Sequence, residues 1–224
     1  MSIDAVADLH DVLRTKVLRF FFKLWGIRVA VIDKGRKEKQ ELTSRRAKVL
    51  RPLRSSFERY GEVFVSLGVS FVPNFVSLYD EGVGDEGLYS ELTPPKSSGE
   101  RWIGVAPFAK HKGKIYPLDR MEKVVSKLSE ESRVKIFLFG SGDREREILS
   151  LWRERYPGVI SLADKRYGFA VELSLMSRLD VMISMDSANM HLASLVEVPV
   201  VSVWGATHPY CGFLGWRQSD SGVV

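Results

Sequence analysis

From residue 102 to residue 204, short apolar runs alternate with segments whose apolar residues recur at helical spacing. This alternation is typical of βαβ units, because parallel strands must be joined by crossover helices. The expected strands cover 102–107, 134–139, 159–162, 181–185 and 200–204. The expected helices between them cover 118–128, 144–155, 169–177 and 187–195. The pattern therefore predicts a doubly wound α/β domain with a parallel sheet.

The N-terminal part shows a shorter version of the same pattern. We expect strands over 5–9 and 28–32, a helix over 12–25, and a second helix over 53–67 after a polar, basic stretch. Residues 76–100 are rich in Pro and Gly, which interrupt every apolar run. We therefore expect a partial N-terminal α/β domain over 1–75, an irregular linker over 76–100, and the main domain over 101–224.

The helix expected over 12–25 has an apolar face. Val17, Phe20, Phe21 and Leu24 follow the spacing i, i+3, i+4 and i+7, which predicts a side buried in a hydrophobic core. A basic amphipathic helix lying on a membrane surface would show the same spacing, and this alternative stays open.

Composition excludes several classes of protein. With 45% hydrophobic and 27% charged residues, the chain of 224 residues has the composition of a globular protein rather than a disordered one. The single cysteine, Cys211, excludes an intramolecular disulfide and fits a reducing compartment. Asp4, Asp8 and Asp11 stand where a signal peptide carries cations. The apolar cluster over 18–25 is far shorter than the ~20 residues of a membrane span. We therefore expect a cytoplasmic protein.

Positive charge is concentrated near the N-terminus. Residues 1–60 contain 15 Lys and Arg against 7 Asp and Glu, whereas residues 61–224 contain 18 against 21. Such asymmetry is compatible with nucleic acid, an anionic lipid surface, an acidic small molecule, or a solvated surface without a partner. The basic region has no recognisable nucleic-acid-binding motif, so we expect no nucleic-acid partner.

Loops that follow the strands of an open α/β sheet are where ligands bind. The loop after strand 102–107 contains Lys110, His111, Lys112 and Lys114 before a helix, which favours an anionic ligand, although such loops are also common as solvated surface. The glycines over 139–144 fit a tight turn without a ligand, or a dinucleotide-type turn that lacks its third glycine.

A third loop joins strand 181–185 directly to a helix. Ser187, Ala188 and Asn189 follow Asp186 and present unpaired amides at the start of the helix, which predicts a phosphate or diphosphate site. His191 lies where it can reach back to the same ligand. The alternative is that Asp186 only caps the helix.

The loop after the last strand contributes Gly205 and Thr207 to the candidate residues. We expect no metal site, because the histidines form no close pair and Cys211 has no partner at zinc spacing. The sequence also lacks a Walker A loop and the G-x-S-x-G elbow of a serine hydrolase.

Several motifs together resemble those of glycosyltransferase family 9, the bacterial lipopolysaccharide heptosyltransferases. The C-terminal signature of that family is similar to DSAxxHLA over 186–193 followed by PVVSVWGATHP over 199–209. KIYP over 114–117 resembles its Lys-x-aromatic-Pro motif, and FGSG over 139–142 its Gly-rich loop. DLH over 8–10 with Arg14, and DKGR over 33–36, resemble its N-terminal domain.

The resemblance implies a GT-B fold of two Rossmann-like domains, of which the N-terminal one is incomplete here. It implies inverting, metal-independent transfer of a heptose from ADP-heptose to a lipid A–core acceptor, with no cofactor. The protein would then act in the cytoplasm, in peripheral contact with the inner face of the membrane.

The resemblance also assigns roles. Lys114 would face the donor diphosphate and Asp186 the donor sugar, so that the two residues meet different parts of one ligand. The remaining donor-binding residues would be Ser187, Ala188, Asn189, His191, Gly205 and Thr207. His10 and Arg14 would lie on the acceptor side.

Two departures from the family pattern matter. Ala188 stands where the family usually has Gly, which narrows the approach of a phosphate but keeps the amide. Family members also begin with a strand and loop that carry an acidic general base, and this sequence starts after them and stops soon after Trp216. We therefore expect a chain truncated at both ends without its general base, with His10 as a candidate replacement.

Other functions stay open at this point. A nucleotide-sugar epimerase or hydrolase of the same architecture would share the phosphate site. A non-catalytic protein that only binds a nucleotide sugar would share it as well.

Overall fold

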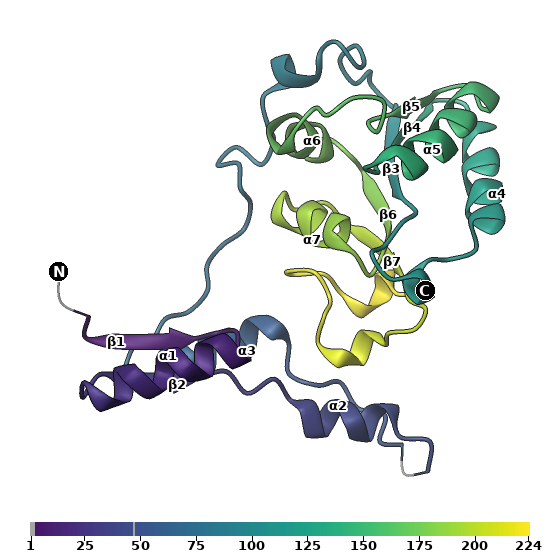
Figure 1. Ribbon diagram of the computed structural model, residues 1–224. Helices are drawn as coiled ribbons and strands as arrows, with labels where there is room; N and C mark the ends of the chain where they lie inside the picture. The colour runs from purple at the N-terminus through teal and green to yellow at the C-terminus, as the bar shows by residue number, and fades with distance from the viewer. Residues whose placement is uncertain (1–2, 47) are drawn as a thin grey trace. The chain divides into compact units, whose positions relative to one another are not determined.

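The computed structural model describes residues 3–46 and 48–224, which divide into two compact units. The first unit contains the residues up to Phe75 together with Tyr210–Phe213. The second contains Val76–Pro209 and Leu214–Val224. Each unit is described separately below, and Figure 1 labels their helices and strands.

The second unit is built on a five-stranded parallel sheet with the strand order β5-β4-β3-β6-β7. The strands are β3 (Arg101–Ala106), β4 (Val134–Leu138), β5 (Val159–Ser161), β6 (Val181–Met185) and β7 (Val200–Val203). The helices between them are α4 (Leu118–Ser129), α5 (Asp143–Arg155), α6 (Phe169–Met176) and α7 (Ala188–Leu195). The predicted alternation is confirmed, and each predicted element lies within two residues of its observed bounds.

Helices cover both faces of this sheet (Figure 1). Trp102 and Phe137 point to a buried cluster that includes α6 and α7, whereas Ile103 and Ile136 point to one that includes α4 and α5. Side chains that alternate along strands with two buried faces explain the continuous apolar runs of the sequence. The chain runs outward from β3 to β5 and then returns to β6 on the other side of β3. The switch point of the sheet therefore lies between β3 and β6.

Residues 76–100 pack onto the second unit. The amide of Gly84 donates a hydrogen bond to Ser177 Oγ at 2.8 Å, and a Cβ at Gly84 would lie 2.4 Å from Ser174 Oγ. The short 3₁₀ helix Glu86–Tyr89 buries Tyr89, whose ring contacts that of Trp102 with centroids 6.1 Å apart. This segment therefore forms part of the core around α6, although it contains no β-strand.

The first unit pairs two parallel strands, β1 (Ala5–Asp8) and β2 (Arg28–Val31), with three helices. These helices are α1 (Leu13–Leu24), α2 (Arg36–Thr43) and α3 (Ser56–Ser66). The buried guanidinium of Arg59 on α3 connects this helix to α2 and to the loop before α2, because it donates to Glu38 Oε2 at 2.6 Å and to the Asp33 carbonyl at 3.1 Å. Tyr210–Phe213 belongs here because Leu53 N donates to the Tyr210 carbonyl at 2.9 Å.

The prediction that the apolar face of α1 is buried is wrong. Val17, Phe20, Phe21 and Leu24 are 52%, 61%, 47% and 65% exposed. The half-buried side chains of α1 are instead Thr15, Arg19 and Phe22, which also follow the spacing i, i+4 and i+7. Helical spacing identifies the residues that share a face, but it does not identify what covers that face. Within the described ranges, no helix has the length and apolarity that crossing a bilayer requires.

Candidate functional site

A cleft of about 680 Å³ opens in the second unit, where the loops after β3 and β6 meet. Its lining residues fall within 108–114 after β3, 140–145 after β4, 169–172 at the start of α6 and 186–192 at the start of α7. The cleft therefore lies at the switch point of the sheet, beyond the carboxyl ends of its strands, as is usual for ligand sites in open α/β sheets.

Asp186 is the most buried ionisable group of the cleft, with 7% of its side chain exposed. Its Oδ2 accepts a hydrogen bond from Lys114 Nζ at 2.7 Å and another from Thr207 Oγ1 at 2.7 Å. Three residues predicted from the sequence, which follow three different strands, are thus in direct contact. Lys114 and Asp186, to which the resemblance assigns different parts of one ligand, form an ion pair here.

The close approach of two loops makes this contact possible. The amide of Ala206 donates to the Gly113 carbonyl at 2.7 Å. A Cβ at Gly205 would lie 2.4 Å from that same carbonyl oxygen, so a larger residue would push the loops apart. Gly205 and Thr207 do not line the cleft themselves. Thr207 donates to Asp186, and Gly205 allows the loop after β7 to approach the loop that contains Lys114.

The start of α7 forms one wall of the cleft. Ser187 is the N-cap residue, with an extended backbone and no side-chain hydrogen bond to the helix. Asp186 does not cap the helix either, because among the described residues its carboxylate accepts hydrogen bonds from Lys114 and Thr207 and from no helix amide. The side chains of the described residues therefore leave the first amides of α7 available to an anion, which the helix dipole also favours.

His191 lines the same wall, one turn into α7. Burial lowers the pKa of its imidazole, and the positive charge of Lys114 lowers it further against the opposing effect of Asp186. The ring is therefore neutral near pH 7 and can accept as well as donate a hydrogen bond.

Two carboxylates from other elements complete the lining. Glu145 on α5 accepts a hydrogen bond from the Ser141 amide at 2.8 Å. Glu172 on α6 is half-buried, and its burial raises the pKa of its carboxyl group. Glu172 was not among the residues predicted from the sequence, where its one signal is that it is the single charged residue of the segment 169–177.

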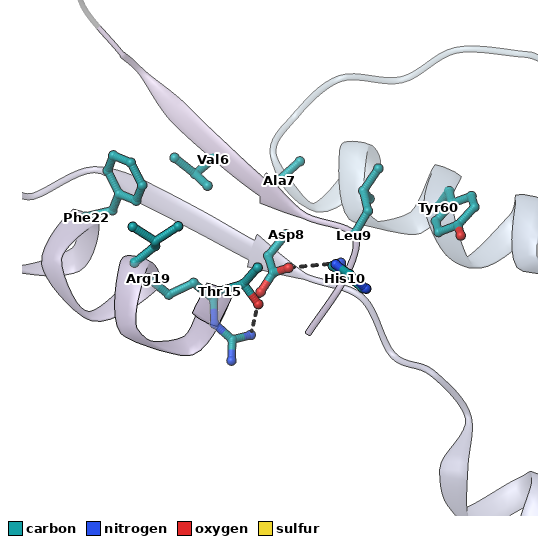
Figure 2. A pocket seen from close by; sticks show the side chains of 10 residues that line it. Val6, Ala7, Asp8, Leu9, His10, Thr15, Arg19, Phe22 and Tyr60 are labelled. Atoms are coloured by element: carbon teal, nitrogen blue, oxygen red, sulfur yellow. Dashed lines mark hydrogen bonds and ion pairs between the residues drawn. The ribbon is translucent and has the colours of Figure 1, made fainter. Parts of the chain in front are cut away.

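The first unit has a separate pocket of about 490 Å³ at the end of β1 (Figure 2). Figure 2 shows Asp8 between His10 and Arg19. The amides of His10 and Asp11 both donate to Asp8 Oδ1 at 2.9 Å, and Arg19 lies 3.3 Å from Oδ2. Burial of Asp8 opposes its ionisation, but these amides and Arg19 outweigh burial and lower the pKa of the carboxyl group. Asp8 is thus an ionised anchor of the loop.

The residues predicted for the acceptor side lie in this unit. His10 lines the pocket and is exposed, whereas Arg14 is exposed on α1 and is not among the lining residues. Among the described residues, no group of three or more His, Cys, Asp or Glu side chains is placed to hold a metal ion.

The sheet order, the cleft at its switch point and the cation beside a helix N-terminus together define a doubly wound α/β unit with a cleft suited to an anionic ligand. The family model of glycosyltransferase family 9 (heptosyltransferase) matches residues 74–220, which is more than half of the chain. The chain belongs to that family.

Solved structures show the same GT-B type fold. The chain is 18% identical to E. coli heptosyltransferase WaaC with ADP, covering 100% of this chain and 66% of that one, with a TM-score of 0.67. The chain is 20% identical to E. coli ADP-heptose lps heptosyltransferase II, covering 99% of this chain and 68% of that one, with a TM-score of 0.62. It is 17% identical to the family 9 glycosyl transferase from Veillonella parvula DSM 2008, covering 98% of this chain and 62% of that one, with a TM-score of 0.71. The chain thus spans about two thirds of these relatives. None of the curated proteins compared with it matches.

The lowered pKa of His191 predicts a pH-dependent stability. Because folded His191 binds a proton less readily than unfolded His191, acidification below about 6.5 favours the unfolded state. His191→Gln should therefore lose less stability than the wild type between pH 7.5 and about 5.5, as measured by thermal unfolding midpoints. His10→Gln, at an exposed histidine, is the control. Parallel wild-type and His191→Gln profiles would contradict the interpretation.

Proposed function

We propose that the cleft binds a nucleotide sugar of the ADP-heptose type and that the protein transfers the sugar, with inversion and without a metal ion, to a lipopolysaccharide core acceptor. The observation that carries this proposal is the Lys114–Asp186 pair beside the open amides of α7, in a chain that belongs to family 9. Two similar structures are those of E. coli heptosyltransferase WaaC with ADP and with ADP-2-deoxy-2-fluoro heptose.

The leaving diphosphate is the group that this arrangement would stabilise. Departure of a nucleoside diphosphate builds negative charge, and a fixed cation beside a helix N-terminus stabilises that charge without a metal. The ammonium of Lys114 has three N–H donors and uses one of them on Asp186. Its other donors and the amides of Ser187, Ala188 and Asn189 would bind the phosphates.

Asp186 would contact the sugar. Both of its hydrogen bonds reach Oδ2, so Oδ1 has no partner among the described residues and can accept from a sugar hydroxyl. Lys114 neutralises the carboxylate, which allows Asp186 to lie close to a diphosphate without strong repulsion. His191 would complete the donor site, with Gly205 and Thr207 supporting it.

The acceptor would bind on the first unit, near His10 and Arg14. His10 is our candidate for the general base, because it is exposed and lines the pocket at the end of β1. The lipid part of the acceptor would place the reaction at the cytoplasmic face of the membrane. The exposed apolar residues Phe20 and Leu24 support such a contact.

Calorimetry with ADP tests the donor site directly. In the presence of a chelator, Lys114→Ala should weaken the binding of ADP by about 1.5–3 kcal/mol, because a charge-assisted hydrogen bond is lost. Lys112→Ala is the matched control, since Lys112 lies on the same loop but does not line the cleft. Equal affinities of the two variants, or binding only after addition of Mg²⁺, would contradict the proposal.

The same titrations separate the sugar from the phosphates. Asp186→Asn should weaken the binding of ADP-heptose more than the binding of ADP, because the contact with the sugar is lost in addition to the ion pair that fixes Lys114. Equal effects on the two ligands would show that Asp186 does not contact the sugar.

Acceptor dependence distinguishes a transferase from a hydrolase or epimerase. We expect that ADP release from ADP-heptose, followed with a coupled assay, requires a lipid A–core acceptor. His10→Ala should lower any such release by about 10²-fold or more. Release at the same rate without acceptor would favour the alternative functions.

Vesicle flotation tests the membrane contact. The chain should float with vesicles that contain anionic lipid, and replacement of Phe20 and Leu24 by Ser should reduce the floated fraction because apolar area is lost. Leu151→Ser, at an exposed apolar residue of α5, is the control. Equal flotation of both variants would exclude the α1 face as the contact.

A further inference from the structure

The pocket of the first unit contains a buried carboxylate oxygen that accepts no hydrogen bond. Asp8 is 5% exposed and lines this pocket at the end of β1. Its Oδ1 accepts from two loop amides, but within the described ranges its Oδ2 has no hydrogen-bond partner. Arg19 faces Oδ2 as an ion pair, with Nη1 at 3.3 Å. Buried polar atoms are normally hydrogen-bonded, so Oδ2 points to a donor on a ligand.

The donors that line the pocket beside Asp8 are directed elsewhere. The Thr15 hydroxyl donates to the Val12 carbonyl at 2.9 Å. Arg19 Nη2 donates to Asp11 Oδ1 at 3.2 Å. A ligand with a hydrogen-bond donor would therefore supply what these side chains do not.

The charges of the pocket decide which donor fits. Arg19 is the cation of the lining, and its two amino groups already face the carboxylates of Asp8 and Asp11. None of the other described lining residues is Lys or Arg, whereas Lys110 and Lys114 both line the cleft of the second unit. An anion would meet the charge of Asp8 without gaining an uncommitted cation, and an ammonium would meet Arg19. A neutral O–H group fits best.

The walls of the pocket are largely apolar and aromatic. Val6 and Leu18 line it, and Figure 2 shows Phe22 and Tyr60 at opposite ends of the row with Asp8 between them. Its volume of about 490 Å³ lies within the ~300–1,000 Å³ of small-molecule sites. A pyranose ring carries hydroxyl donors at its edge and apolar C–H faces that pack on aromatic rings. A neutral sugar therefore matches both the walls and Asp8.

We propose that this pocket binds the terminal sugar of the acceptor, that this sugar is neutral, and that one of its hydroxyls donates to Asp8 Oδ2. The inference rests on the proposed function, which places the acceptor near His10, another residue of the lining. A terminal sugar that carries a carboxylate or a phosphate is disfavoured, because Asp8 repels it.

The test is a titration of the whole chain followed by NMR. The probes are the methyl glycosides of glucose, galactose and mannose, each compared with its uronic acid, in which a carboxylate replaces the CH₂OH group. The neutral glycoside that binds most tightly should bind about tenfold or more tighter than its uronic acid, because Asp8 repels the added charge.

Asp8→Asn tests the carboxylate itself. The amide oxygen can still accept from the amides of His10 and Asp11, so the loop keeps its hydrogen bonds. The variant should bind the neutral glycoside about fivefold or more weaker, because a charged acceptor is lost. Its preference over the uronic acid should fall to about threefold or less, because the repulsion is also lost. Asp4→Asn, at an exposed carboxylate before β1, should keep the wild-type values.

Tyr60→Ala is a second variant, at a residue that is 40% exposed and does not depend on the fold of the Asp8 loop. It should weaken the neutral glycoside and its uronic acid alike, by about threefold or more, because both lose the same apolar contact. The dispersion of the amide signals in the same spectra shows whether each variant is folded.

Three results would overturn the inference. They are equal binding of a glycoside and its uronic acid by the wild type, an equal loss of both in Asp8→Asn, and no saturable binding of any of the glycosides. In each case the binding of ADP to the second unit would persist, so the donor site of the proposed function would survive. Absence of ADP binding with an intact preference for the neutral glycoside would instead overturn the proposed function and leave the pocket as a sugar site.

Discussion

The carboxylate of Asp186 organises the cleft of the second unit. It lies directly after strand β6, almost excluded from solvent, and accepts from both Lys114 and Thr207. A buried carboxylate is tolerated only when it is paired and hydrogen-bonded. The pair fixes Lys114 at the mouth of the cleft, and the same requirement forces the loop after β7 against the loop after β3, where Gly205 allows the backbones to touch. The site is therefore rigid at its cationic end.

That rigidity has a chemical use. An ammonium held in place beside open helix amides needs no reorganisation when charge develops on a leaving diphosphate. Glu172 in the same cleft is half-buried, and its burial raises the pKa of its carboxyl group.

Much of the second unit could be predicted from the sequence because its signals are local. Strands buried on both faces give continuous apolar runs, and Asp186 with its following amides marks the start of a helix in a short stretch of chain. The contact between Lys114 and Asp186 could not be predicted, since the two residues are 72 positions apart and meet only because β6 pairs with β3. The Gly84–Ser177 and Leu53–Tyr210 hydrogen bonds depend on distant residues in the same way. The exposed face of α1 could not be predicted either, because Phe20 and Leu24 have the spacing of core residues although they are exposed.

The central claim is that the diphosphate of a nucleotide binds at the start of α7 beside Lys114. A crystal structure of the complex with ADP tests it most directly. We expect phosphate oxygens within hydrogen-bond distance of the amides at 187–189 and of Lys114 Nζ, with Asp186 still paired. Phosphates bound elsewhere, or held through a metal ion with Lys114 turned away, would show that the start of α7 is not the diphosphate site.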